Sequence, residues 1–208
     1  VAIEQSRALQ QQLAILFVDL DHFKEVNVTL GHDYGDRLLV QAAQRILDCV
    51  AATDTVARMG GDEFTVMLRD AHDTQEIECT MHRILASLAN VFQLGSEQVF
   101  VSASIGVAQY PLNAARVEEL FKHADQALYV AKGAGRNCFS FFTPALQEAS
   151  QLRARLAADL RVALQHSQFE LLYQPIVHLS SGQVFKAEAL LRWHHPQRGT
   201  VSPAQFIP

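Results

Sequence analysis

The sequence feature that most constrains the fold is an uninterrupted apolar run that ends in a carboxylate. Leu13–Asp19 reads LAILFVD, with no polar side chain before the final acid. A short continuous apolar run of this kind predicts a strand buried at the centre of a sheet. The run also delivers Asp19 to the end of that strand, where acids are rare unless they are paired or bind a metal ion.

Helical and strand patterns alternate through residues 13–142. The spacing of apolar side chains predicts helices over residues 21–30, 33–52, 74–89 and 117–131. Strand patterns occupy residues 54–59, 64–68, 91–94, 98–110 and 137–142. Glycine-containing turns at Gly60-Gly61 and Gly95-Ser96 join two pairs of these strands, which favours antiparallel pairing within the sheet. We therefore expect one α/β sandwich over this part of the chain.

The segments outside this sandwich indicate a second, incomplete domain. Residues 1–12 are polar and helix-compatible, and Pro144 marks a boundary before an amphipathic helix over 145–166. Strands over 169–177 and 183–193 then flank a Ser-Ser-Gly turn. Because an isolated hairpin is only marginally stable in water, we expect these strands to begin a larger domain. The predicted organisation is a first domain over 1–142, a connecting helix over 143–166 and a domain fragment over 167–208.

Composition and charge exclude several classes of protein. The 208 residues are 49% hydrophobic, which is enough to bury a sizeable core. A formal charge of −5 argues against binding to nucleic acid. No apolar run approaches the roughly 20 residues of a membrane span, and the first residues lack a signal-peptide pattern, so we expect no membrane contact within this chain. Three scattered cysteines, Cys49, Cys79 and Cys138, favour a reducing cytoplasm over a disulfide framework.

Two acidic groups are candidates for binding metal ions. Asp19 ends the buried strand, and Asp62-Glu63 follows the two glycines of the first hairpin turn. Glycines let a backbone approach a ligand closely, and carboxylates from two sheet elements suit a hard cation such as Mg²⁺. Two such ions about 4 Å apart would serve phosphoryl or nucleotidyl transfer. The alternative is that these are ordinary acids of a solvated turn.

Two further groups of polar residues suit a nucleotide. Lys24 follows the buried strand and is a candidate for contact with a triphosphate, while Asn27 and Asp36 carry the donors and acceptors that a purine edge requires. Lys132 and Arg136, near the end of the last helix of the sandwich, suit phosphate groups through their charge and donors. The alternatives are helix capping and a polar helix face for the first group, and a cationic helix C-terminus for the second.

In this order the polar motifs resemble the diguanylate cyclase (GGDEF) domain family. The resemblance covers about residues 13–142 through FVDLDHFKEVN at 17–27, GHDYGD at 31–36, ARMGGDEF at 57–64, SASIGVA at 102–108 and DQALYVAKGAGRN at 125–137. The tail resembles the start of the EAL phosphodiesterase family through FELLYQPIV at 169–177, AEALLRW at 187–193 and SPAQFIP at 202–208. The chain thus looks like part of a bacterial GGDEF–EAL tandem protein.

The GGDEF resemblance implies a palm-like α/β fold and a particular reaction. Two GTP molecules are condensed to cyclic di-GMP with release of two pyrophosphates. The catalyst implied is a homodimer in which two domains face each other and each holds one GTP. The resemblance further implies two Mg²⁺ or Mn²⁺ ions per GTP site, bound by Asp19, the Leu20 carbonyl and Asp62.

The same resemblance implies roles for the other polar residues. Asp62 is also the candidate base for the 3′-hydroxyl, and Glu63 supports the metal cluster. The remaining implied roles are contact with phosphates for Lys24, Lys132 and Arg136, recognition of guanine for Asn27 and Asp36, and bracing of the glycine turn for Arg58.

The chain departs from the GGDEF pattern at two places. Val28 stands where the family usually has an Asp after the Asn. The family's inhibitory R-x-x-D motif is represented by Ala51-Ala52-Thr53-Asp54, which lacks the Arg, so we expect weak or no product inhibition through that site. Val28 and the tandem arrangement leave a second function open, in which the domain binds GTP without forming product and regulates an attached EAL domain.

The EAL resemblance assigns roles to three residues of the tail. Gln174 would line the ligand site, Glu188 would bind a metal ion and Arg192 would bind a ligand phosphate. The later metal ligands and the base of that family lie beyond Pro208. Since Glu188 alone cannot assemble a two-metal site, we expect no phosphodiesterase activity from this chain.

Overall fold

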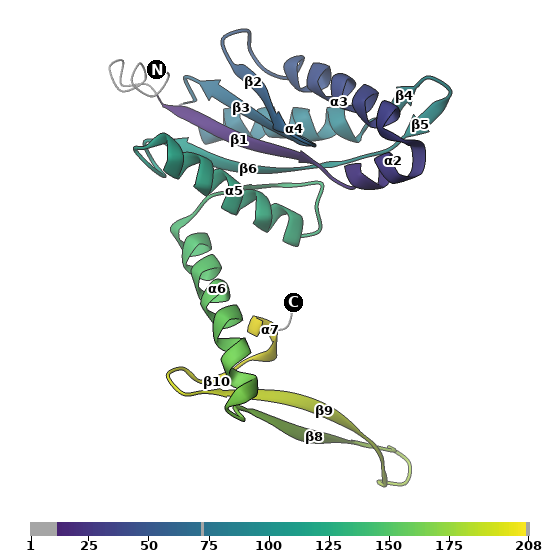
Figure 1. Cartoon of the computed structure of the whole chain (residues 1–208), viewed down its shortest axis with the longest axis vertical. Coiled ribbons are helices and arrows are strands. Elements are labelled where there is room, and N and C mark those ends of the chain that lie inside the picture. Colours follow the sequence, from purple (N-terminus) through teal and green to yellow (C-terminus); the bar gives the residue numbers. More distant parts are fainter. Residues whose placement is uncertain (1–11, 72, 207–208) are drawn as a thin grey trace. The chain divides into compact units, whose positions relative to one another are not determined.

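The computed structural model describes residues 12–71 and 73–206, which fold as two compact units that divide between Gln147 and Glu148 (Figure 1). Apart from Gln12, the helix-compatible stretch over residues 1–12 lies outside the described residues, as do the last two residues of the SPAQFIP motif.

The first unit is built on a five-stranded sheet in the order β2-β3-β1-β6-β7. The central strand β1 (Leu13–Leu20) pairs antiparallel with β3 (Glu63–Arg69) and with β6 (Ala103–Tyr110). β2 (Thr55–Gly60) forms one edge as the hairpin partner of β3, and β7 (Phe139–Phe141) forms the other edge, parallel to β6. The buried apolar run is therefore the central strand, as its sequence predicts.

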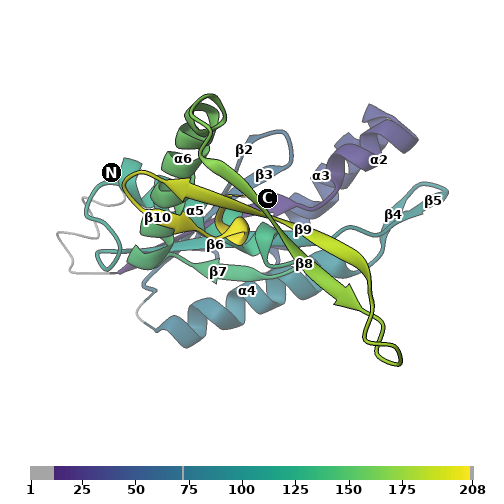
Figure 2. The same cartoon turned by 90° about the horizontal axis from the view of Figure 1, so that it is seen from below.

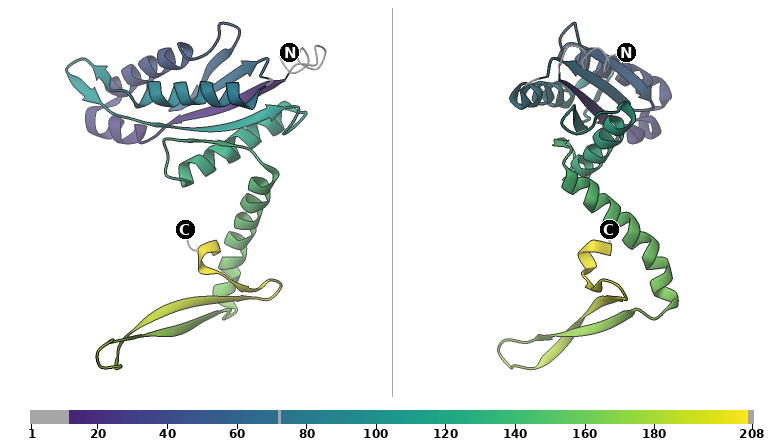
Figure 3. Two further views of the ribbon diagram at one scale, coloured as in Figure 1. Left: turned by 180° about the vertical axis from the view of Figure 1, so that it is seen from behind. Right: turned by 90° about the vertical axis from the view of Figure 1, so that its left-hand side faces the viewer.

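Helices cover both faces of this sheet (Figures 1 and 3). Alternate side chains of β1, such as Leu16 and Val18, pack with α2 (Phe23–Leu30), α3 (His32–Leu47) and α4 (Thr74–Ala89). Leu13 and Ile15 point to the opposite face, where they pack with α5 (Val117–Gly133). Because successive side chains of a strand alternate between faces, one apolar strand supplies both cores.

The predicted strand over residues 98–110 is wrong as one continuous element. β4 (Phe92–Leu94) and β5 (Glu97–Val99) form a separate two-stranded ribbon, and β6 begins only at Ala103. Figure 2 shows this ribbon projecting past the main sheet, beside α3. The Ser102 carbonyl accepts a hydrogen bond from the Asp21 amide at 2.8 Å, so this residue continues the pairing of β6 with the end of β1 and does not belong to the ribbon.

Helix α3 is shorter than the apolar spacing predicts, since it ends at Leu47. The amides of Cys49 and Val50 donate to carbonyls only three residues back, at 3.0 and 3.3 Å, so the helix tightens and stops there. The bounds predicted for α4 agree with the structure.

The second unit has a small core of its own. It contains α6 (Pro144–Gln165) from Glu148 onward, β8 (Phe169–Val177), β9 (Val184–His195), β10 (Gly199–Val201) and α7 (Pro203–Phe206). Trp193 is completely buried against α6 and β10, and its Nε1–H donates to the side-chain oxygen of Gln168 at 3.1 Å. The β8–β9 hairpin agrees with the predicted strands, whereas β10 and α7 carry no clear periodicity and are additions from the structure.

Helix α5 approaches the main sheet closely at Gly106 of β6. A Cβ atom at this position would lie 2.1 Å from the Ala124 carbonyl oxygen and 2.2 Å from the Leu128 backbone nitrogen. Both of those atoms belong to the backbone of α5, so a side chain at residue 106 requires the helix to move. The missing side chain therefore sets the distance between α5 and the sheet.

Substitution of Gly106 by Ala should destabilise the first unit by about 3 kcal/mol, because the added methyl group overpacks a contact between two backbones. Urea unfolding followed by far-ultraviolet circular dichroism measures the change. The matched control is Gly133→Ala on α5, where a Cβ would meet nothing within 4 Å and the change should stay within about 1 kcal/mol. An unfolding midpoint for Gly106→Ala equal to that of the wild type contradicts the packing argument.

Candidate nucleotide and metal site

Asp19 is a buried acid whose side chain contacts a lysine of α5. Its side chain is 8% exposed, and its Oδ2 lies 2.7 Å from the Nζ of Lys132. Burial raises the pKa of the Asp19 carboxyl above its ordinary value. The hydrogen bond and charge of Lys132 oppose this rise in pKa, while the charges of Asp62 and Glu63 add to it. Asp19 therefore lies within electrostatic reach of both acids of the glycine turn.

The pairing of β1 with β3 brings the glycine turn to the end of the central strand. Asp19 is opposite Glu63 in the antiparallel register, and the Leu20 amide donates to the Asp62 carbonyl at 3.3 Å. Gly61 has a φ of 54°, which favours glycine, and the Arg58 Nε donates to its carbonyl at 2.9 Å. This hydrogen bond is of the kind that the family resemblance implies for Arg58.

The turn is open to solvent, so a ligand can reach it. Gly60, Gly61 and Glu63 are exposed, and Asp62 is partly exposed. An acidic turn packed under other elements would not serve as a binding site, and this turn is not so packed.

The donor set fits a metal ion that arrives with a nucleotide. Within residues 12–71 and 73–206, no three His, Cys, Asp or Glu side chains gather as a complete metal site. Magnesium in proteins is usually held by one or two carboxylates, with water and substrate phosphates completing its shell. The Asp19 and Asp62 carboxylates with the Leu20 carbonyl meet that requirement without forming a closed protein cage.

The predicted phosphate-facing cations differ in their surroundings. Lys132 is paired with Asp19, whereas Lys24 in the first turn of α2 and Arg136 after α5 are exposed. In the described part of the chain, neither Lys24 nor Arg136 forms a hydrogen bond or an ion pair through its side chain. Their charges are thus available to an anionic ligand.

Asp21 organises the edge of the site, a role that its sequence position did not indicate. It is 2% exposed and accepts hydrogen bonds from Ser102 Oγ at 2.6 Å, Ser104 Oγ at 2.8 Å and the Asn137 amide at 3.2 Å. These contacts tie the end of β1 to β6 and to the segment that carries Arg136. The signal in the sequence is the two-residue spacing of Ser102 and Ser104, which in an extended chain puts both hydroxyls on one side.

The two residues expected to recognise guanine lie on the α2–α3 helical hairpin. Asn27 is partly exposed on α2, but its Oδ1 atom is buried and has no hydrogen-bond partner among the described residues. Asp36 is exposed on α3 and forms no hydrogen bond or ion pair within the described residues. Both side chains therefore have unused hydrogen-bonding capacity.

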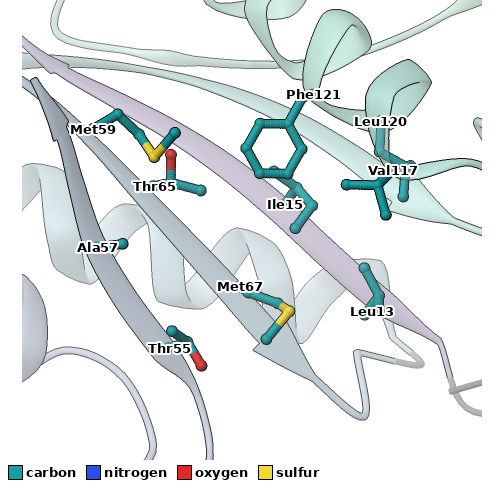
Figure 4. Close-up of a pocket in the computed structure, with 10 residues that line it drawn as sticks. All are labelled: Leu13, Ile15, Thr55, Ala57, Met59, Thr65, Met67, Val117, Leu120 and Phe121. Carbon is teal, nitrogen blue, oxygen red and sulfur yellow. The ribbon is translucent and has the colours of Figure 1, made fainter. Parts of the chain in front are cut away.

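An apolar pocket of about 300 Å³ lies elsewhere, on the face of the sheet that α5 covers only in part (Figure 4). No acid or base lines it, so it cannot supply the chemistry considered above. Its lining residues are Leu13, Ile15, Thr55, Ala57, Met59, Thr65, Met67, Val117, Leu120 and Phe121.

The second unit brings the predicted EAL residues onto one face of the β8–β9 hairpin. Gln174 and Glu188 are direct partners in the antiparallel register, and both are exposed. Arg192 lies four residues further along β9 and so projects from the same face as Glu188.

No helix in the described ranges combines the length and the apolarity that crossing a membrane requires.

Comparisons with known proteins identify both parts of the chain. The family model described as diguanylate cyclase, GGDEF domain, matches residues 1–138, and the EAL domain model matches residues 157–208. The bifunctional diguanylate cyclase/cyclic di-GMP phosphodiesterase MucR of Pseudomonas aeruginosa is 42% identical over 207 residues, covering 100% of this chain and 30% of MucR. The cyclic di-GMP phosphodiesterase NbdA of the same organism is 40% identical over 205 residues, covering 99% of this chain and 26% of NbdA. The chain spans less than a third of the length of these curated relatives.

Solved structures support the same assignment. The GGDEF domain of YfiN (TpbB) from Pseudomonas aeruginosa superposes with a TM-score of 0.67 at 37% identity, covering 68% of this chain and 89% of that one. The GGDEF domain of DgcB from Caulobacter crescentus, in complex with cyclic di-GMP, superposes with a TM-score of 0.61 at 26% identity, covering 67% of this chain and 83% of that one. The chain therefore belongs to the GGDEF domain family of cyclic di-GMP signalling proteins, and it continues into part of an EAL domain.

Proposed function

We propose that the GGDEF domain is a diguanylate cyclase that condenses two GTP molecules into cyclic di-GMP and releases two pyrophosphates. The observation that carries the proposal is the convergence of Asp19, Leu20 and Asp62 at an exposed glycine turn, beside the cation of Lys132. Acids and a lysine at one open edge are the groups that a nucleoside triphosphate with its metal ions requires.

In this proposal the Asp19 and Asp62 carboxylates and the Leu20 carbonyl hold two Mg²⁺ or Mn²⁺ ions. Bound metal ions neutralise developing charge on phosphate oxygens and lower the pKa of an attacking hydroxyl. Asp62, which is partly exposed at the turn, accepts the proton of the 3′-hydroxyl, and Glu63 keeps the local field negative. Lys24, Lys132 and Arg136 orient the triphosphate, whose reaction depends mainly on position and charge neutralisation.

The reaction requires two GTP molecules facing each other, so the active species in this proposal is a homodimer. Asn27 and Asp36 hold the guanine of one GTP, and the partner domain presents the second. The exposure of the glycine turn supports this arrangement, because a second domain can approach it.

A second candidate function is a GTP-binding module that makes little product and regulates the attached EAL domain. Val28 favours it, since this side chain is 78% exposed on α2 beside Asn27, where the family usually has an acid. The partial EAL domain and the phosphodiesterase name of NbdA, a relative of the same tandem arrangement, favour it as well.

Replacement of Asp62 by Ala should lower cyclic di-GMP formation from GTP and Mg²⁺ by about 10²-fold or more, because a metal ligand and the candidate base are removed together. The rate of cyclic di-GMP formation is measured by chromatographic separation of the nucleotides. The control is Asp48→Ala at the C-terminal end of α3, which removes an acid whose side chain accepts a hydrogen bond from Gln44 and has no other hydrogen bond or ion pair among the described residues. GTP binding by a wild type that forms no product would instead support the regulatory function.

Asp19 should make the stability of the metal-free protein depend on pH. Its folded-state pKa is raised above the ordinary value of 3.8, so between the two values the folded protein binds more protons than the unfolded chain. The free energy of unfolding therefore falls as pH rises through that window. The Asp19→Asn variant lacks this fall in the free energy of unfolding. The difference in that free energy, variant minus wild type, should therefore grow with pH and then level off. Urea unfolding with EDTA across pH 3–8 measures it, and a difference that shrinks as pH rises contradicts the assignment.

Asp54 should not mediate inhibition by cyclic di-GMP. Its two carboxylate oxygens accept hydrogen bonds from the amides of Ala51 and Arg69, each at 2.9 Å, so it is occupied in joining the start of β2 to the end of β3. Asp54→Ala should lower stability by about 1–3 kcal/mol and leave the inhibition curve unchanged. A sensitive inhibition curve that disappears in this variant contradicts the expectation.

For the partial EAL domain we propose no phosphodiesterase activity in this chain. Glu188 and its partner Gln174 are exposed on a two-stranded hairpin, and among the described residues no further acids join Glu188 to complete a metal site.

A further inference from the structure

Asn27 lies against the backbone of α3 at Gly35. A Cβ atom at residue 35 would lie 1.9 Å from the Asn27 Oδ1, 2.9 Å from its Cγ and 3.2 Å from the Phe23 Cζ. No side chain larger than hydrogen fits there unless Asn27 moves. Glycine at this position therefore sets where the Asn27 amide lies.

The Asn27 amide is held by this contact with little help from hydrogen bonds. Its Oδ1 is buried and unpartnered among the described residues, which is rare for a buried acceptor and points to a role other than stability. The oxygen and nitrogen of an amide point in different directions from its carbon. Burial of the oxygen against Gly35 therefore turns the amino group, which carries two donors, away from Gly35.

Asp36 follows Gly35 directly, and its exposed carboxylate has no partner among the described residues. One short stretch of α3 thus contacts Asn27 and carries Asp36, the two residues expected to recognise guanine. The Asp36 carboxylate can accept from both the N1–H and the N2–H₂ of guanine while an amide amino group donates to another atom of its edge. Adenine has no hydrogen on N1 and no 2-amino group, so the same carboxylate complements it less well.

We propose that Gly35 is a positioning residue for purine selection, which seats Asn27 so that its amino group and the Asp36 carboxylate address the same guanine. This inference rests on the proposed binding of GTP. It also explains why the fourth residue of α3 is glycine, although alanine is the better helix former.

The packing part of the inference can be tested without a nucleotide. Alanine in place of glycine normally stabilises a helix interior. Gly35→Ala should instead lower the thermal midpoint of unfolding in the wild-type background, because its methyl group collides with Asn27. In the Asn27→Ala background only the contact with the Phe23 Cζ at 3.2 Å remains, so the same change should lower the midpoint much less than in the wild type, or raise it. A fall in the midpoint that is as large in the Asn27→Ala background as in the wild type overturns the packing contact.

The recognition part is tested by titration calorimetry of the full chain with Mg²⁺ and the α,β-methylene analogue of GTP or of ATP. Gly35→Ala should weaken binding of the GTP analogue by about tenfold and reduce its preference over the ATP analogue. The double variant Gly35→Ala/Asn27→Ala should bind no more weakly than Asn27→Ala alone. Val40→Ala is the control, since Val40 is 71% exposed on the same helix and should bind as the wild type does.

The outcomes separate this inference from the proposed function. Wild-type affinity in Gly35→Ala, or additive losses in the double variant, overturns the positioning role while GTP binding by the wild type stands. Absence of binding by the wild type overturns both, although a smaller loss of the thermal midpoint in the Asn27→Ala background would still establish the contact between Gly35 and Asn27.

Discussion

The register of β1 against β3 is the constraint on which the site depends. It sets Asp19 opposite Glu63 and places the Leu20 amide on the Asp62 carbonyl, so the end of the central strand and the glycine turn form one edge. A slip of one residue would turn Asp19 from the α5 face to the face of α3 and α4, among apolar side chains and away from Lys132. The register resists slipping because both faces of β1 are buried in packed cores.

Two acids close together at the end of this strand have different surroundings and suit different roles. Asp21 has two hydroxyl donors and one backbone amide, so its charge is satisfied within the fold. Asp19 has one lysine and two acids nearby, and burial raises its pKa. The hydrogen bonds of Asp21 thus brace the end of the strand. Burial disfavours the charged form of Asp19, and a bound cation would offset that cost. A residue that opposes stability in this way is characteristic of a functional site.

Close packing at two glycines positions the flexible side chains of the site. Gly106 lets α5 approach the sheet, and α5 carries Lys132 to Asp19. Gly35 lets the Asn27 amide lie against α3. In both cases an absent side chain fixes a helix or an amide by contact with backbone, which is stiffer than contact with a mobile side chain. The chain positions its polar groups through backbone contacts as well as through hydrogen bonds.

The sequence by itself determined the elements whose burial follows a local period. The apolar run identifies β1 and the apolar spacing identifies α4, because the residues of each element indicate which side is buried. The two glycines identify the turn between β2 and β3. The motif order likewise pointed to the family. Tertiary structure alone decided that residues 98–110 divide at Ser102, that Asp21 receives the hydroxyls of Ser102 and Ser104, and that Lys132 pairs with Asp19. These partners lie about a hundred residues apart along the chain, and local periodicity carries no information on which distant backbone or side chain satisfies a buried charge.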